Sequence, residues 1–225
     1  VLIFLSGDRS AFFNINLSAI FIILLSKRLF KLRLLTLIIS ILILLIITII
    51  NPTAKERIFD QTIDQMKVEN HEEDRFYIFS KQHTHHYITA YRMFLDNKVL
   101  GVGIKNFRNF CSNEKYQESK LSCSTHPHNA YIQILSETGI VGLLFVLFLL
   151  YYFCKYIFKH LFLKFKGQYY FSDFEICILS GIAIYLWPLI PTGNLFTNWL
   201  SILMFINVPF LIWSLDSKKT KLSNN

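Results

Sequence analysis

The residues best suited to chemistry gather in one string that runs from His126 to Gly142. Pro127 biases His126 away from the helical region of backbone space, so we expect a helix that begins near His128 or Asn129. The string therefore places His128 and Asn129 at the start of a helix.

Three polar residues continue this helix at a spacing of four, namely Asn129, Gln133 and Glu137. Residues four apart share one helix face, so they form a polar stripe, and the helix then runs on into a long apolar segment. A carboxylate near a membrane is costly unless it faces a cavity or a protein partner. We interpret the stripe as the lining of an external cavity. The alternative is that Glu137 pairs with another helix and only orients the bundle.

Histidines and cysteines also raise the possibility of a metal site. The pairs His83-x-His85-His86 and His126-x-His128 could bind zinc or copper, and Cys111 and Cys123 lie between them in the sequence. No carboxylate or cysteine spacing fixes a metal site, so we expect ordinary loop histidines apart from His128, and no metal or other cofactor. Cys111 and Cys123 are 12 residues apart in a polar region, where a disulfide is plausible if that region faces an oxidising compartment. The pair Gly101-x-Gly103 is better explained as a turn than as a phosphate cradle.

Composition and hydropathy indicate the helices that position these residues. Hydrophobic residues make up 53% of the chain and charged residues 17%, and the mean hydropathy is +0.40. Soluble domains carry roughly 25% charged residues, so lipid is the expected solvent for much of the chain. Five spanning segments are predicted: Ala11–Ser26, Leu32–Ile50, Asn129–Phe158, Phe174–Ile190 and Leu195–Leu215. The apolar start at Val1 resembles the end of such a segment, so we expect the chain to be part of a longer protein.

Basic residues set the expected orientation. They cluster in the connection between the first two spans, after the third span and after Asp216, and the positive-inside rule places all three clusters in the cytoplasm. The formal charge of +8 is thereby explained by topology, and nucleic-acid binding loses its support. We predict an all-α, polytopic transmembrane helix bundle with a long, partly helical external loop. Its parts are residues 1–50 with two spans, the external region 51–128, three spans in 129–215, and the cytoplasmic tail 216–225.

Several of these motifs together carry a family resemblance. Over roughly residues 5 to 150 the chain resembles the C-terminal portion of the O-antigen ligase and polymerase superfamily. The resemblance rests on these strings: Ser6-Gly7-Asp8-Arg9-Ser10-Ala11, Asp96-Asn97-Lys98-Val99-Leu100-Gly101-Val102-Gly103, Asn106-Phe107, His128-Asn129, Gln133, and Glu137-Thr138-Gly139-x-x-Gly142. Lys98 stands where the family usually has a proline.

The resemblance implies a membrane glycosyltransferase of lipopolysaccharide or polysaccharide biosynthesis. It would need no metal and would use a polyprenyl-diphosphate-linked glycan as donor, with a glycan or lipid A core as acceptor. His128 would be the catalytic base, and Arg9 would bind the donor diphosphate. The family's second arginine is not in place, since His83 to His86 occupy that region. Arg75 and Arg92 are displaced candidates, and we assign Arg92, although it could simply snorkel from an amphipathic helix.

The resemblance also implies a place in the cell, the bacterial inner membrane, with the active site on the periplasmic side. A second function class remains open, a polysaccharide or lipid-linked sugar transporter or flippase subunit, in which the polar stripe would line a pathway. Transporters commonly contain repeated or broken helices in corresponding halves, and none are visible in this sequence. A membrane anchor with a binding ectodomain would leave the stripe unexplained. The sequence does not separate ligase from polymerase.

Overall fold

The computed structural model describes residues 1–66 and 80–223, and these are helical without any strand. The helices are α1 (Leu2–Ser6), α2 (Arg9–Leu25), α3 (Phe30–Ile50), α4 (Pro52–Lys55), the π-helix η1 (Glu56–Asp60), α5 (Gln61–Met66), α6 (Lys81–Asp96), α7 (Phe107–Phe110), α8 (Ala130–Phe165), α9 (Asp173–Leu186), α10 (Asn198–Phe205) and α11 (Asn207–Ser223). The prediction of an all-α chain is confirmed for this part of the molecule.

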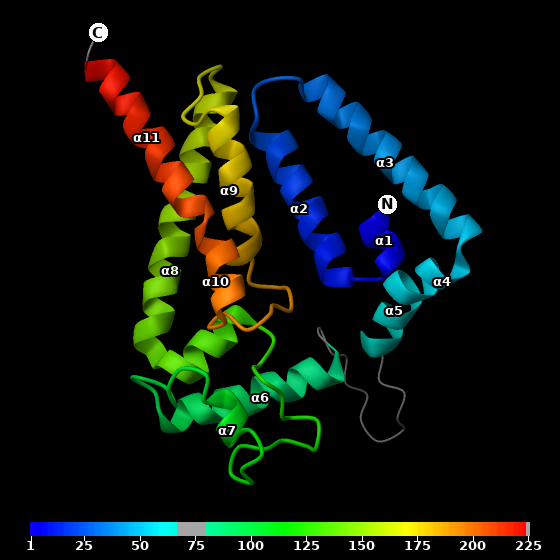
Figure 1. The fold of residues 1–225 in the computed structure, drawn as a ribbon, viewed down its shortest axis with the longest axis vertical. Coiled ribbons are helices and arrows are strands. Elements are labelled where there is room, and N and C mark those ends of the chain that lie inside the picture. Colours follow the sequence, from blue (N-terminus) through cyan, green and yellow to red (C-terminus); the bar gives the residue numbers. More distant parts are fainter. Residues whose placement is uncertain (67–79, 224–225) are drawn as a thin grey trace.

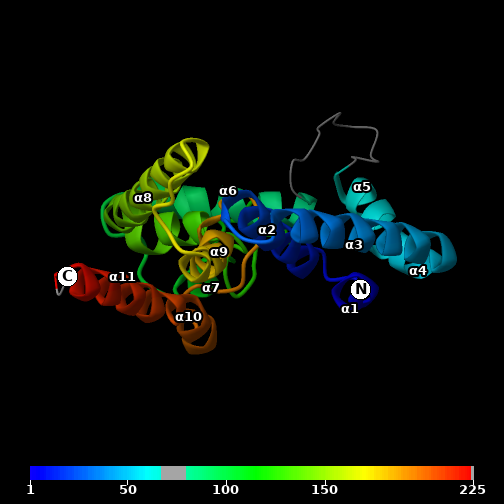
Figure 2. The same ribbon diagram turned by 90° about the horizontal axis from the view of Figure 1, so that it is seen from above.

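The long helices run between two ends of the molecule (Figure 1). One end, called the basic end below, carries the α2–α3 turn, the α8–α9 turn and the end of α11. The opposite end, called the site end, carries the start of α2 together with α6, α7 and the start of α8. Seen from above, α2 and α9 lie in the middle, with α8 and α11 on one side and α3 on the other (Figure 2). The basic clusters and the His128 region are thus separated by the length of the helices.

Two helices, α3 and α8, are long and apolar enough to cross a membrane, and α2 and the segment Ser201–Ser217 are shorter apolar helices. No residue of α3 is fully buried, and most of its leucines and isoleucines are exposed, while Leu44 and Ile47 pack against Phe4 and Ile58. An apolar face of that extent marks a surface that is covered by lipid or protein and not by water. The predicted segment Leu195–Leu215 proves to be two helices, because Pro209 has no N–H to donate to the carbonyl of Phe205, where α10 ends.

The core of the bundle forms where α2, α9 and α11 meet. Leu25, Phe171, Ile176 and Leu179 are buried together there. The buried His160 closes the basic end, because its Nε2 lies 3.0 Å from the Leu25 carbonyl and its Nδ1 accepts the backbone N–H of Phe171. These contacts fix the α8–α9 turn to the end of α2.

Helix α8 is broken near its start at Gly139, whose φ of 67° and ψ of −161° are accessible in practice to glycine alone. The break frees two carbonyls and two amides that a continuous helix would pair with each other. The loop 98–103 pairs with all four of these groups. Its bonds are Val102 N to Ser136 O at 2.9 Å, Gly103 N to Glu137 O at 3.0 Å, Ile140 N to Lys98 O at 2.8 Å, and Val141 N to Val99 O at 3.4 Å.

Glycines make this close approach of two backbones possible. A Cβ on Gly139 would lie 2.3 Å from the Val99 carbonyl oxygen, and a Cβ on Gly101 would lie 2.4 Å from the backbone carbon of Glu137. Gly101 also has a positive φ of 67°. The two glycines therefore allow the two backbones to pack closely. The loop 98–103 is bound to α8 by backbone hydrogen bonds, as a neighbouring strand would be in a sheet.

Replacing Gly139 by alanine should prevent this packing. The new methyl group would clash with Val99 and would force a glycine-only conformation, so we expect Gly139→Ala to cost more than about 3 kcal/mol of stability. Gly167→Ala is the matched control, because Gly167 also has a positive φ but no atom lies within 4 Å of the place where its Cβ would be; it should cost roughly 1–2 kcal/mol. Thermal unfolding of the purified proteins in detergent measures both. Equal losses for the two variants would contradict the packing argument.

Candidate functional site

The carboxylate of Glu137 holds the loop that follows the α8 contact. It accepts the backbone N–H groups of Lys105 and Phe107 at 3.0 and 3.1 Å, and the side-chain amide of Gln133 at 3.1 Å. Glu137 is only 1% exposed, and three donors satisfy its charge inside the protein. Its role is therefore to position the start of α7.

The other two residues of the predicted stripe hold a second loop, between α9 and α10. Gln133 donates to Asn194 Oδ1 at 2.8 Å and accepts the N–H of Leu195, and Asn129 donates to the Pro188 carbonyl at 2.8 Å. Gln133 is fully buried and Asn129 is 5% exposed. The expected cavity lining is therefore corrected: these polar side chains point into protein and pair with loops, which lies closer to the orienting alternative.

A disulfide connects α7 to the histidine string. Cys111, directly after α7, is bonded to Cys123, and their Cα atoms are 4.9 Å apart. Phe107 and Cys111 are buried against Ala90 and Met93 of α6. The segment that leads to His126 is thus attached to both α6 and α7.

Four histidines from two segments meet at the site end. The His128 ring centroid lies 4.1 Å from that of His126, 5.3 Å from that of His86 and 5.4 Å from that of His83. His128 has a positive φ of 60°, which is uncommon outside glycine, and its carbonyl accepts the N–H of Thr192 at 2.9 Å. The α9–α10 loop thus holds this backbone at the start of α8.

The ring nitrogens of His126 and His128 have hydroxyl or carbonyl partners. His126 Nε2 lies 3.0 Å from the Thr192 carbonyl, which can only accept, so Nε2 carries the proton and Nδ1 is free to accept from the Thr125 hydroxyl. His128 Nε2 lies 2.9 Å from the Ser124 hydroxyl. A neutral His128 with Nε2 unprotonated would accept a hydrogen bond from a hydroxyl at this position.

Burial keeps this cluster uncharged. It lowers the pKa of His128 below 6.5, and the neighbouring His126 lowers it further. Burial also lowers the pKa of His86 to about 4, with His128 and His83 adding to the shift. His86 is fully buried, and neither of its ring nitrogens forms a well-aligned hydrogen bond in the described part of the chain. The nearby Leu121 backbone raises the pKa of His86 and so partly opposes the effect of burial. Near pH 7 these rings are neutral and can accept protons.

The charges of two arginines reach the histidine cluster. The pKa of His83 is lowered first by burial, then by His128 and then by the charge of Arg9. The pKa of His126 is also lowered by burial; its bond to Thr192 opposes the shift, and the charge of Arg108 adds to it. Arg9 begins α2 and donates to the Thr62 hydroxyl at 3.2 Å. The structure therefore brings Arg9 and His128 to the same end of the bundle, from positions far apart in the sequence.

A cavity of about 320 Å³ lies beside this cluster. Its walls include Asp8 and Ser10, which flank Arg9, together with Ala130 and Thr192, which adjoin His128. Arg9 and His128 themselves are not among its lining residues. The neighbours of both residues thus enclose one space.

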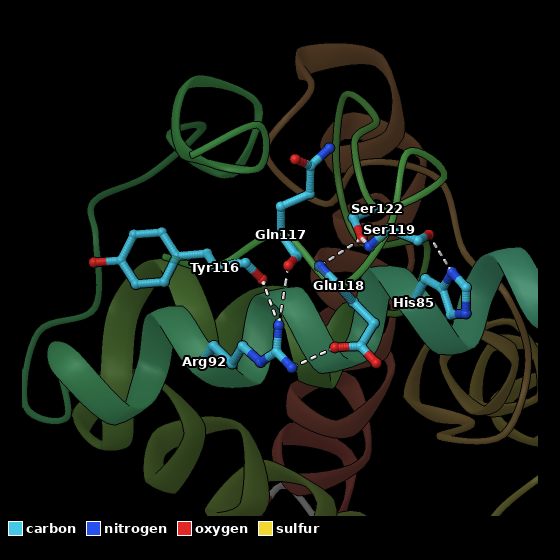
Figure 3. Close-up of polar contacts among 7 residues, drawn as sticks. All are labelled: His85, Arg92, Tyr116, Gln117, Glu118, Ser119 and Ser122. Atoms are coloured by element: carbon cyan, nitrogen blue, oxygen red, sulfur yellow. Dashed lines mark hydrogen bonds and ion pairs between the residues drawn. The ribbon is translucent and has the colours of Figure 1, made fainter. Parts of the chain in front are cut away.

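Arg92, the other predicted diphosphate ligand, points elsewhere (Figure 3). Its guanidinium forms an ion pair with Glu118 and donates to the Gln117 carbonyl at 3.1 Å. A carboxylate already balances its charge, so Arg92 fastens the 116–118 loop to α6. The assignment of Arg92 to the donor stays a prediction, and Arg75 lies outside the described residues.

Sequence reasoning missed Arg108, and it considered His83 and His86 beside His128 only as possible metal ligands. Arg108 is exposed on α7, and its placement depends on the Glu137 and disulfide contacts, which no local spacing reveals. His83 and His86 are three apart on α6 and so share a face, and that spacing was the one available signal. Within residues 1–66 and 80–223, no three histidine, cysteine or acidic side chains are grouped so as to hold a metal ion.

Comparison with known families gives one match. The family model described as O-antigen ligase matches residues 1–147, about two thirds of the chain. The match includes Arg9, the clustered histidines and the break at Gly139. Neither the curated proteins nor the solved structures contain a match to the chain.

Proposed function

The chain belongs to the O-antigen ligase family, and on that basis we propose that it transfers a glycan from a polyprenyl-diphosphate donor to an acceptor sugar hydroxyl. Membership of the family makes it a membrane protein of lipopolysaccharide or polysaccharide biosynthesis and a glycan-processing enzyme. The observation that carries the proposal is the neutral histidine cluster around His128, with Arg9 and Arg108 beside it.

In the proposed reaction, His128 acts as the general base. The acceptor hydroxyl takes the place of Ser124 at Nε2 and gives its proton to this nitrogen while its oxygen attacks the anomeric carbon of the donor sugar. The bond from that carbon to the diphosphate oxygen breaks with its electron pair, and polyprenyl diphosphate leaves. The products are the new glycosidic bond, protonated His128 and the lipid diphosphate.

Arg9 and Arg108 are proposed to bind the diphosphate, which gains negative charge as the glycosidic bond breaks. A guanidinium matches phosphate oxygens with two parallel hydrogen bonds, and it keeps its charge at every working pH. Arg108 takes the place in this proposal that Arg92 loses through its pairing with Glu118. The space between Asp8, Ser10 and Thr192 would admit the head group.

We further propose that the site end faces the periplasm and the basic end the cytoplasm of a bacterial inner membrane. The arrangement of the helices supports this, because the α2–α3 and α8–α9 turns lie at one end, and α6 and the start of α8, which carry the clustered histidines, lie at the other (Figure 1). The transporter alternative is less well supported, since Gln133 and Glu137 are buried against loops and so leave no polar stripe to line a pathway. Lipid A core and a second lipid-linked glycan both remain suitable acceptors.

Replacing His128 by alanine should abolish transfer. We expect a fall in kcat of about 10²–10⁴-fold, because the acceptor hydroxyl would lose its base. His85→Ala is the matched control, since His85 lies on α6 but bonds to Ser119 outside the cluster, and it should retain activity. Both variants should reach wild-type levels in the membrane. Near wild-type transfer by His128→Ala, measured with purified donor and acceptor, would refute the assignment of the base.

The pH dependence of kcat/KM should report the same group. A base acts in its unprotonated form, and because the pKa of His128 is lowered, activity should persist as the pH falls to 6.5 and decline only below it. The measurement is a rate profile from about pH 4.5 to pH 8, with stability checked at each pH. An acidic limb centred above 6.5 would conflict with a buried, neutral His128.

The two arginines should affect the donor more than the acceptor. Arg9→Lys keeps the charge but loses the paired hydrogen bonds, and Arg108→Gln loses the charge, so each should raise the donor KM on the order of tenfold. Lys120→Gln, which removes an exposed charge from a nearby loop, serves as control. If Arg108→Gln left the donor KM unchanged, Arg108 would have no part in binding the diphosphate.

A further inference from the structure

The basic end contains a second pocket, far from the histidines. A cavity of about 520 Å³ lies between the α2–α3 turn and the α8–α9 turn, lined by Lys27, Arg28, Asp173 and the segment 169–172. Asp173, the one acidic residue among those that line this cavity, already has hydrogen-bond and ion-pair partners. The Asp173 carboxylate accepts the backbone N–H groups of Lys27 and Arg28 at 2.7 and 3.2 Å, and it pairs with Arg33 at 3.6 Å.

The pocket therefore keeps an excess of positive charge, because its one lining carboxylate, Asp173, is shared between the charges of Arg28 and Arg33 and the backbone amides. Neither the Lys27 nor the Arg28 side chain forms an ion pair with a carboxylate in the described part of the chain, and both are exposed. The Lys27 ammonium lies 4.9 Å from the centroid of the Tyr169 ring, and the Lys159 ammonium lies 4.4 Å from that of the Tyr170 ring. The pocket thus offers two cations and two tyrosine rings, a combination suited to an anion at a membrane surface.

An apolar groove continues from this pocket toward the middle of the helices. It has a volume of about 710 Å³ between α8, α9, α10 and α11, and Tyr170 and Phe171 line both spaces. Its remaining walls are almost entirely apolar and include Phe153, Leu179 and Leu211. A ligand that fills both spaces must carry an anionic head and a hydrocarbon chain.

We propose that this pocket and groove bind an anionic phospholipid, with its phosphate on Lys27 and Arg28 and an acyl chain between α8, α9 and α11. Basic pockets between transmembrane helices are suited to such head groups. Free phosphate would leave the groove unused. The lipid-linked donor is excluded as the occupant by position, because a head group at the basic end is separated from His128 by the length of α8 (Figure 1).

The test measures lipid binding by the purified protein in a neutral detergent, using native mass spectrometry. Phosphatidylglycerol should bind, and phosphatidylcholine, which has no net charge, should bind far less. The double variant Lys27→Gln/Arg28→Gln should weaken phosphatidylglycerol binding by about tenfold or more, since each surface cation contributes to the attraction. The matched control Lys98→Gln/Lys120→Gln removes the same charge from exposed positions near the site end and should bind like the wild type.

Two further arms separate the possible ligands. Soluble glycerol phosphate carries the same head group without chains, so it should not compete with the lipid at millimolar concentration. Equal competition by glycerol phosphate, displacement of phosphatidylglycerol by polyprenyl phosphate in preference to other lipids, or full binding by the double variant would each overturn the proposal. Single variants Lys27→Gln and Arg28→Gln, each with a smaller loss, guard against misfolding of the double variant. Lipid binding is measured without glycan transfer, so its outcome does not depend on the proposed enzyme activity.

Discussion

The exchange of backbone hydrogen bonds between α8 and the loop 98–103 is the constraint on which the site end depends. A helix near lipid cannot leave its amides and carbonyls unpaired, so a break in α8 is tolerated only if another segment supplies the missing partners. The loop does so with four bonds around Gly139. Because two backbones must touch, Gly101 and Gly139 cannot carry a Cβ, and the glycines of the motif follow from this packing.

Each later part of the site is positioned through that contact. Glu137, two residues before the break, fixes the start of α7 through two backbone amides, and α7 presents Arg108 and leads to the Cys111–Cys123 disulfide. The chain then returns to His128 at the start of the same helix. The structural polar residues Asn129, Gln133 and Glu137 thus follow His128 along a few turns: Glu137 is bound by the loop, whereas the His128 ring lies beside a hydroxyl.

Much of this could be predicted from the sequence, and the misses have physical causes. Helical periodicity and hydropathy predict α3 and α8, and proline chemistry places His128 near a helix start. A polar stripe shows only that Gln133 and Glu137 avoid lipid; it does not say whether a cavity or a loop satisfies them, because most of their partners lie on distant segments. The pairing of Arg92 could not be predicted either, since its partner Glu118 is 26 residues away.

Basic side chains occupy three different environments in this fold, and the neighbouring groups determine the role of each side chain. Arg92 meets a free carboxylate and becomes a structural tie. At the basic end, the Asp173 carboxylate accepts two backbone amides and pairs with Arg33. Lys27 and Arg28 therefore leave an excess of positive charge beside an apolar groove. Arg108 is instead exposed on α7, near enough to His126 for its charge to lower the pKa of that ring. The lowered pKa of the clustered histidines leaves them able to accept a proton near neutral pH and adds no positive charge beside the arginines, and in the proposed reaction both properties would serve the transfer.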